Sequence, residues 1–203
     1  EDAEAAALRG LLAKSSQAIV SVKVVLKMET GGRGGGFGGP SESRQTLQGV
    51  NVHPSGLIML SNTPFSPKRM MEMMGGSGMS EMMGDMKATP TSIKVLVAGD
   101  ETEYDGFVGA TDTNLDLLFV RIESPGTLKL PVVDFGSSAS PSIGQIVVMI
   151  SRLNRGYDHA PYFQTARING EIAKPRRAWT LDGSISQFGL PVYTTKGETV
   201  GVL

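Results

Sequence analysis

Few side chains in this sequence could perform chemistry. It has no Cys and only two His, which excludes disulfides, thiolate metal sites and a Cys nucleophile. His53 begins a His-Pro-Ser-Gly turn signal and is expected to be a solvated turn residue. His159 follows Tyr157 and Asp158 and could supply a general base, but no Ser lies in a nucleophile context for it. Neither His identifies a catalytic site by itself.

Short strands separated by turns are expected to position whatever site exists. Residues 1–14 are the exception and predict a helix, because Ala and Leu are strong helix formers and acids occupy the first turn. Elsewhere, β-branched and alternating apolar residues predict strands at 18–28, 45–53, 57–61, 92–98, 103–109, 115–122, 144–150, 162–173, 190–194 and from residue 198 onward. Strands at this spacing with little helix between them favour an antiparallel barrel or sandwich.

Two segments interrupt this pattern. Residues 31–43 are Gly-rich and are expected to form a surface connection, since no Lys-Ser/Thr closes them as in a phosphate-cradling loop. Residues 68–88 contain eight of the eleven Met and are interpreted as an insertion between core strands. This insertion could be a flexible loop, an adaptable partner-binding patch or a Cu(I) site. The absence of His and Cys from it weighs against copper.

Composition narrows the range of partners. The 203 residues carry a net charge of −1, so there is no electrostatic case for nucleic acid or an anionic membrane. No apolar run reaches the ~20 residues that a membrane-spanning helix needs. A signal peptide is not evident, and a sequence that begins at Glu1 is expected to be a mature or trimmed product.

Four segments, in this order, give the sequence a family resemblance. The run Gly-Val-Asn-Val-His-Pro-Ser-Gly-Leu-Ile-Met-Leu-Ser-Asn covers residues 49–62, and Asp-Thr-Asn-Leu-Asp-Leu-Leu-Phe-Val-Arg-Ile covers residues 112–122. Gly-Gln-Ile-Val-Val-Met-Ile follows at 144–150, and Ser-Gln-Phe-Gly-Leu-Pro-Val at 186–192 precedes a last strand. Together they resemble the trypsin-like protease domain of the HtrA (high-temperature-requirement) family.

This resemblance implies an all-β fold of two packed antiparallel six-stranded barrels with a cleft between them. Residues 1–203 would form a single domain that begins with the short helix. The N-terminal barrel would span about 16–122, a linker 123–140 and the C-terminal barrel 141–203. Because the sequence stops inside a strand, a closing strand is expected from further chain or from another molecule.

The resemblance also implies that the catalytic triad has decayed. Its His, Asp and Ser positions fall on Thr63, Asp116 and Phe188. A Thr hydroxyl does not titrate near neutral pH and a phenyl ring has no nucleophilic oxygen, so neither proton transfer nor acyl transfer is expected. Ser186 replaces the usual Gly of the oxyanion hole, and its side chain is expected to disturb the peptide that donates there.

The remaining residues near this loop have alternative interpretations. Phe188 either fills the empty cleft as a buried side chain, which is favoured, or plugs the substrate path and makes the cleft a binding groove. Ser184 and Ser186 are expected to be loop residues rather than a relocated nucleophile. Asp182 falls at the floor of the family's primary specificity pocket and is assigned a structural role. Asp116 is expected to bond to loop backbone or to Thr63.

The expected function is therefore a catalytically inactive trypsin-like homologue that binds or scaffolds a protein or peptide partner, without a cofactor or a metal. The alternatives are an active serine endopeptidase whose site is misplaced here, and a metal- or stress-responsive structural protein that works through the Met-rich segment. By resemblance alone, a homo-oligomer and a periplasmic or secreted location are expected. The family usually carries PDZ domains after the protease domain, and the sequence does not tell whether they follow Leu203.

Overall fold

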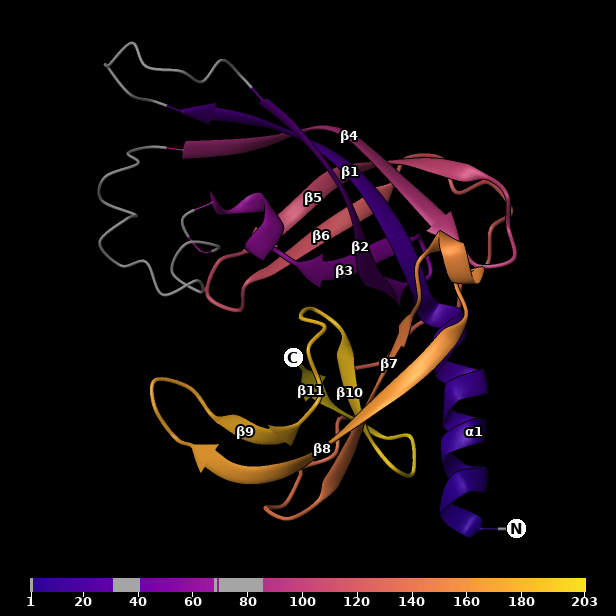
Figure 1. Cartoon of the computed structure of the whole chain (residues 1–203), viewed down its shortest axis with the longest axis vertical. Coiled ribbons are helices and arrows are strands. Elements are labelled where there is room, and N and C mark those ends of the chain that lie inside the picture. Colours follow the sequence, from indigo (N-terminus) through magenta and orange to yellow (C-terminus); the bar gives the residue numbers. More distant parts are fainter. Residues whose placement is uncertain (1, 31–40, 68, 70–85) are drawn as a thin grey trace.

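The computed structural model describes residues 2–30, 41–67, 69 and 86–203. Within these ranges it is mostly β-structure, with the α-helix α1 near the N-terminus (Figure 1). The elements are α1 (Ala3–Ser15), β1 (Ile19–Thr30), β2 (Ser41–His53), β3 (Leu57–Ser61), η2 (Thr63–Phe65), β4 (Met86–Val97), β5 (Glu103–Asp112), β6 (Leu117–Ile122), β7 (Ile146–Arg152), η3 (Arg155–Tyr157), β8 (Pro161–Ile172), β9 (Ala178–Gly183), β10 (Pro191–Thr194) and β11 (Thr199–Val202), with the short 3₁₀ turn η1 (Ser16–Ala18) after α1.

The first six strands form a closed antiparallel barrel in the order β1-β2-β3-β6-β5-β4. Alternation along β1 explains why it closes: Val20, Val22, Val24 and Leu26 all point into the barrel core. Ile58 of β3 lies opposite Val120 of β6 in the register, and both are fully buried. The N-terminal barrel expected from the sequence is thus confirmed.

The second lobe is a curled antiparallel sheet of five strands in the order β11-β10-β7-β8-β9. It is therefore not the closed six-stranded barrel that the family resemblance implies, because the described residues supply no sixth strand. Strand β7 is the centre of this lobe, and its residues Val147 to Ile150 are buried. Between the lobes, residues 123–145 form no strand. The two-lobed trypsin-like fold stands, with the second lobe open.

The helix and the lobes share one hydrophobic core. Leu11 of α1, Val50 of β2, Met149 of β7 and Tyr193 of β10 belong to the same buried cluster. Asp2 caps α1 by accepting a hydrogen bond from the backbone of Glu4 at 3.0 Å, as expected for a helix that starts at an acidic end. Within the described ranges, no helix has the length and apolarity to cross a bilayer.

Several predicted boundaries were wrong. Residues 41–43 belong to β2 and residues 86–88 to β4, so both interrupting segments are shorter than predicted. Apart from Arg69, the other parts of those segments lie outside the described residues. Strand β9 was not predicted, because its half-exposed, weakly alternating residues give little periodic signal. Residues 115–116 form a turn before β6 rather than its start.

Candidate functional site

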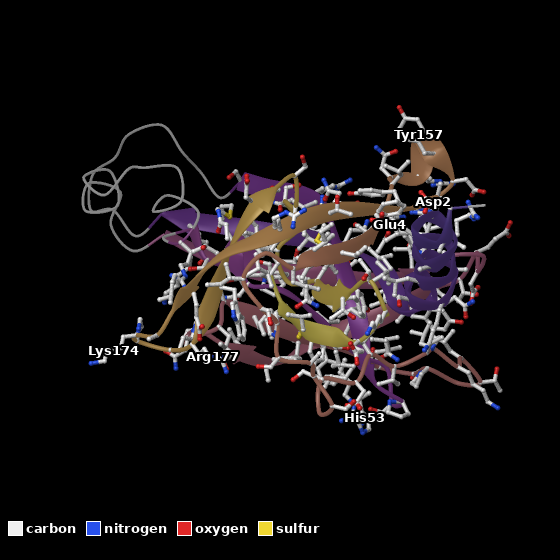
Figure 2. The ribbon with its side chains drawn as sticks, turned by 90° about the horizontal axis from the view of Figure 1, so that it is seen from below. Asp2, Glu4, His53, Tyr157, Lys174 and Arg177 are labelled. Carbon is white, nitrogen blue, oxygen red and sulfur yellow. The ribbon has the colours of Figure 1, made fainter. Side chains whose placement is uncertain are left out.

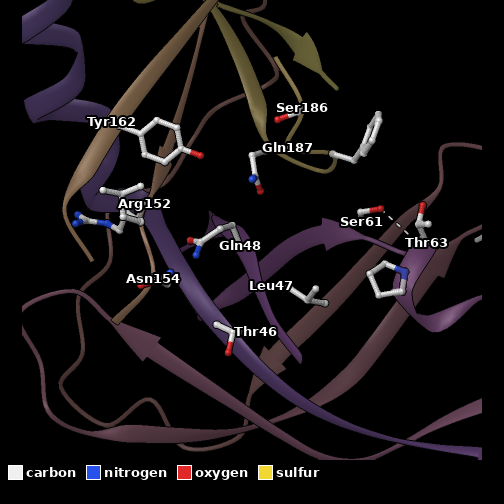
Figure 3. Close-up of a pocket in the computed structure, with 13 residues that line it drawn as sticks. Thr46, Leu47, Gln48, Ser61, Thr63, Arg152, Asn154, Tyr162, Ser186 and Gln187 are labelled. Carbon is white, nitrogen blue, oxygen red and sulfur yellow. Dashed lines mark hydrogen bonds between the residues drawn. The ribbon is translucent and has the colours of Figure 1, made fainter. Parts of the chain in front are cut away.

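A cleft of about 440 Å³ lies between the barrel and the second sheet. Strand β2, the end of β3 and the following turn η2 form its barrel side, as Figure 3 shows. The end of β7, strand β8 and the loop before β10 form its other side. The lining residues are Thr46, Leu47, Gln48, Ser61, Thr63, Pro64, Arg152, Leu153, Asn154, Tyr162, Ser186, Gln187 and Phe188.

Gly189 fixes the loop that carries Phe188 against the barrel. Its φ is +81°, a left-handed conformation that favours glycine, and a Cβ there would lie only 2.1 Å from the backbone nitrogen of Ser61. Its N–H donates to the carbonyl of Leu203 at 2.8 Å, which ties the loop to the end of β11. The absence of a side chain at Gly189 therefore lets Phe188 sit beside the end of β3.

Asp116 and Thr63 meet at the same end of the cleft. Asp116 has a φ of +55° in the turn before β6, and its carbonyl accepts the N–H of Asn62 at 2.8 Å. Its Oδ2 accepts a hydrogen bond from the Thr63 hydroxyl and a longer one, at 3.4 Å, from the Ser61 hydroxyl. The expected hydrogen bond between Thr63 and Asp116 is present.

A guanidinium approaches the other carboxylate oxygen of Asp116. The Nε of Arg69 lies 3.6 Å from Asp116 Oδ1, and its Nη2 donates to the carbonyl of Thr113 at 3.5 Å. Asp116 is thus neutralised by a cation and held by hydroxyls. In a triad the Asp would instead accept from an imidazole.

Both His residues lie elsewhere. His53 hydrogen-bonds Ser55 at 2.8 Å in its exposed turn, which confirms the sequence interpretation. The Nδ1 of His159 lies 3.4 Å from the hydroxyl of Ser21 and borders a separate cavity of about 620 Å³. Among the described residues, therefore, no imidazole lines the cleft.

Phe188 is half exposed, with 49% of its surface accessible. The favoured interpretation, a buried side chain that fills the cleft, is therefore wrong. The reason is geometric: the β3 backbone already occupies the space next to Gly189, and the Phe188 ring is left half exposed where it lines the cleft. Ser186 is also exposed and lines the cleft. Asp182 lies exposed on β9 opposite Arg167 and does not line the cleft.

Three polar cleft residues had no distinguishing signal in the sequence: Arg152, Gln48 and Tyr162. Arg152 donates to the carbonyl of Ser16 at 2.7 and 3.1 Å and to that of His159 at 3.0 Å, and burial lowers the pKa of its guanidinium. Gln48 donates to Ser21 at 3.3 Å, while its buried Oε1 accepts no hydrogen bond. The hydrogen-bond partners Ser16 and Ser21 lie far from Arg152 and Gln48 in the sequence, so the sequence alone did not single these residues out.

The cleft offers hydroxyls, amides and aromatic rings, but among the residues that the structure describes none is placed there to take a proton from a nucleophile. In the described part of the chain, His, Asp and Glu nowhere gather in threes as a metal ion would need. The arrangement suits hydrogen bonding and apolar contact with a bound segment.

Comparisons with known proteins agree with this fold. Residues 84–202 match the profile of the trypsin-like peptidase domain. A solved structure described as the crystal structure of Deg5 superimposes with a TM-score of 0.63 at 20% identity, over 100% of this chain and 86% of that one. That likeness extends to the fold alone. None of the curated proteins matches this chain.

Proposed function

The chain belongs to the trypsin-like peptidase domain family, and we propose that it is a catalytically inactive, HtrA-type member that binds protein or peptide segments in its cleft. The observation that carries this proposal is the environment of Asp116, whose carboxylate bonds to Thr63 and pairs with Arg69. Neither a hydroxyl nor a guanidinium can act as a general base at neutral pH. Phe188 occupies the nucleophile position without any oxygen to attack a carbonyl.

Two features favour a cleft that binds a protein or peptide segment over a cleft that has lost its function. Phe188 exposes about half of a large apolar surface beside Leu47 and Pro64, and a bound segment would remove that surface from water. The exposed Ser186 lines the same cleft, and its hydroxyl could hydrogen-bond to a bound peptide. An apolar wall with a few convergent polar groups is typical of a binding site.

The first test concerns catalysis. The chain is incubated with a fluorophosphonate probe and with unfolded casein, beside active trypsin as a positive control. We expect trypsin to be labelled and to cut casein, while the chain does neither, because it lacks both the base and the nucleophile. Covalent labelling of the chain, or casein cleavage that persists in the purified protein, would overturn the proposed inactivity.

The second test concerns binding, with fluorescein-labelled unfolded casein as the probe in an anisotropy titration. Covering the exposed half of a Phe contributes about 1 kcal/mol, so Phe188→Ala is expected to weaken binding about fivefold. Phe107→Ala is the matched control, since Phe107 is 47% exposed but lies on β5 and does not line the cleft. Equal losses in both variants would refute binding at the cleft.

Three further features remain predictions from the resemblance: a single protease-fold domain with its linker at 123–140, assembly into a homo-oligomer and a periplasmic or secreted location. Size-exclusion chromatography with light scattering measures the assembly state directly. A monomer at all concentrations would contradict the oligomer.

A further inference from the structure

The hairpin loop between β8 and β9 concentrates positive charge. Residues 174–177 include three cations, Lys174, Arg176 and Arg177, and all three are exposed. Figure 2 shows the side chains of Lys174 and Arg177 pointing outward at one end of the molecule. Such a cluster attracts anionic groups unless neighbouring carboxylates neutralise it.

Contacts hold two of these side chains, and one of the two is paired with a carboxylate. Arg176 donates to the backbone carbonyl of Asn114, a neutral acceptor. The Arg177 guanidinium stacks over Trp179, 5.1 Å from the ring centroid. Its Nε bonds Glu171 at 2.8 Å, which leaves the outer guanidinium nitrogens for another acceptor. Within the described residues, no carboxylate pairs with Lys174 or Arg176. Ordered guanidiniums lose less conformational entropy when they bind.

A fourth cation lies at the same place. Arg69 donates to the carbonyl of Thr113, and Arg176 donates to that of the next residue, Asn114. Both guanidiniums therefore bond to the same turn, residues 113–116, which ends at Asp116. We call Arg69, Lys174, Arg176 and Arg177 the basic rim. It adjoins the end of the cleft where Asp116 bonds to Thr63.

We propose that the basic rim is a docking site for an acidic peptide segment of a partner protein. Guanidiniums bind carboxylates in a planar, bidentate geometry, and separate carboxylates on a peptide match separate cations. Nucleic acid fits less well, because the chain has a net charge of −1 and the rim offers only four cations to a phosphate backbone. This site goes beyond the proposed cleft binding and does not depend on it.

The experiment uses a fluorescein-labelled octapeptide of alternating Glu and Gly, with a peptide carrying Gln in place of Glu as the neutral control. Anisotropy is measured at low and at physiological salt. We expect the chain to bind the acidic octapeptide in preference to the neutral one. Removing the three loop cations, as Lys174→Ala, Arg176→Ala and Arg177→Ala together, is expected to weaken binding about tenfold or more.

A matched variant tests the location. Arg44→Ala, Arg121→Ala and Lys129→Ala together remove one Lys and two Arg from exposed positions outside the loop, and should leave binding nearly unchanged. Because all six side chains are exposed, both triple variants are expected to fold, which circular dichroism verifies. Reversing the loop charges to Glu should also transfer binding to a Lys-Gly octapeptide.

Three outcomes overturn the proposal: equal binding of the acidic and neutral peptides, equal losses in the two triple variants, or tighter binding of single-stranded DNA than of the acidic octapeptide. The last result would assign the rim to nucleic acid. If the chain does not bind casein but binds the acidic octapeptide, only the proposed binding in the cleft is refuted.

Discussion

Adding one methyl group at Gly189 tests how the cleft is assembled. The Cβ of Gly189→Ala would lie 2.1 Å from the Ser61 nitrogen, 2.6 Å from the Leu60 carbonyl carbon and 2.9 Å from the Ser61 Cα. These are backbone atoms of β3, which cannot rotate away as a flexible side chain can. Either the loop or the barrel edge must shift.

Two costs add up in this variant. A non-glycine residue at a φ of +81° loses about 1–2 kcal/mol, and forced displacement of packed atoms costs about 1–3 kcal/mol. We therefore expect Gly189→Ala to lower the free energy of unfolding by about 3 kcal/mol. Gly99→Ala separates the two costs, because Gly99 has a φ of +79° with nothing within 4 Å of the added Cβ. It should lose only about 1 kcal/mol.

The assay is equilibrium urea denaturation of the wild type and both variants. A difference of about 2 kcal/mol between Gly189→Ala and Gly99→Ala corresponds to a midpoint shift of about 1 M, for an m-value of about 2 kcal/mol/M. The m-values should agree, since the surface exposed on unfolding does not change. If the two variants differ by less than about 0.5 kcal/mol, Gly189 does not pack against β3 as described.

Three further predictions concern Thr63, Asp116 and the buried Tyr193. Thr63→Val removes the hydroxyl that bonds the Asp116 carboxylate and is expected to cost about 1–2 kcal/mol by denaturation, whereas a cost below experimental error would show that the bond does not stabilise the fold. Asp116→Ala should destabilise more than Asp116→Asn in the same assay, because Asn tolerates a φ of +55° better than Ala; the reverse order would refute a role for the turn conformation. Burial raises the pKa of Tyr193 to about 12 from 10.0, so the folded state favours the neutral phenol. The stability that this preference contributes is complete below pH 10, and roughly 2–3 kcal/mol is lost as the pH rises through about 12. A Tyr193→Phe chain that lost the same stability over this pH range would contradict the assignment.

The sequence predicted most of the strands because each depends on its own alternation. In β1, a side chain every second residue faces the barrel core, and this period is visible without knowledge of any neighbour. Strand β9 was not predicted, because it is its pairing with β8 that makes it a strand. The open second lobe also depends on pairing between distant segments, which local periodicity does not report.

For the candidate site, the sequence by itself determined which chemistry the aligned positions could carry. Thr63 cannot act as a base, because its hydroxyl does not titrate near neutral pH. Phe188 cannot act as a nucleophile, because its phenyl ring has no oxygen. Both statements hold whatever surrounds the side chains. Only the tertiary structure decided what those side chains contact. Phe188 is exposed because Gly189 meets the β3 backbone, and the basic rim exists because residues 69, 113–116 and 174–177 converge. Residue type is a local property, whereas exposure and proximity arise from packing between segments far apart in the chain.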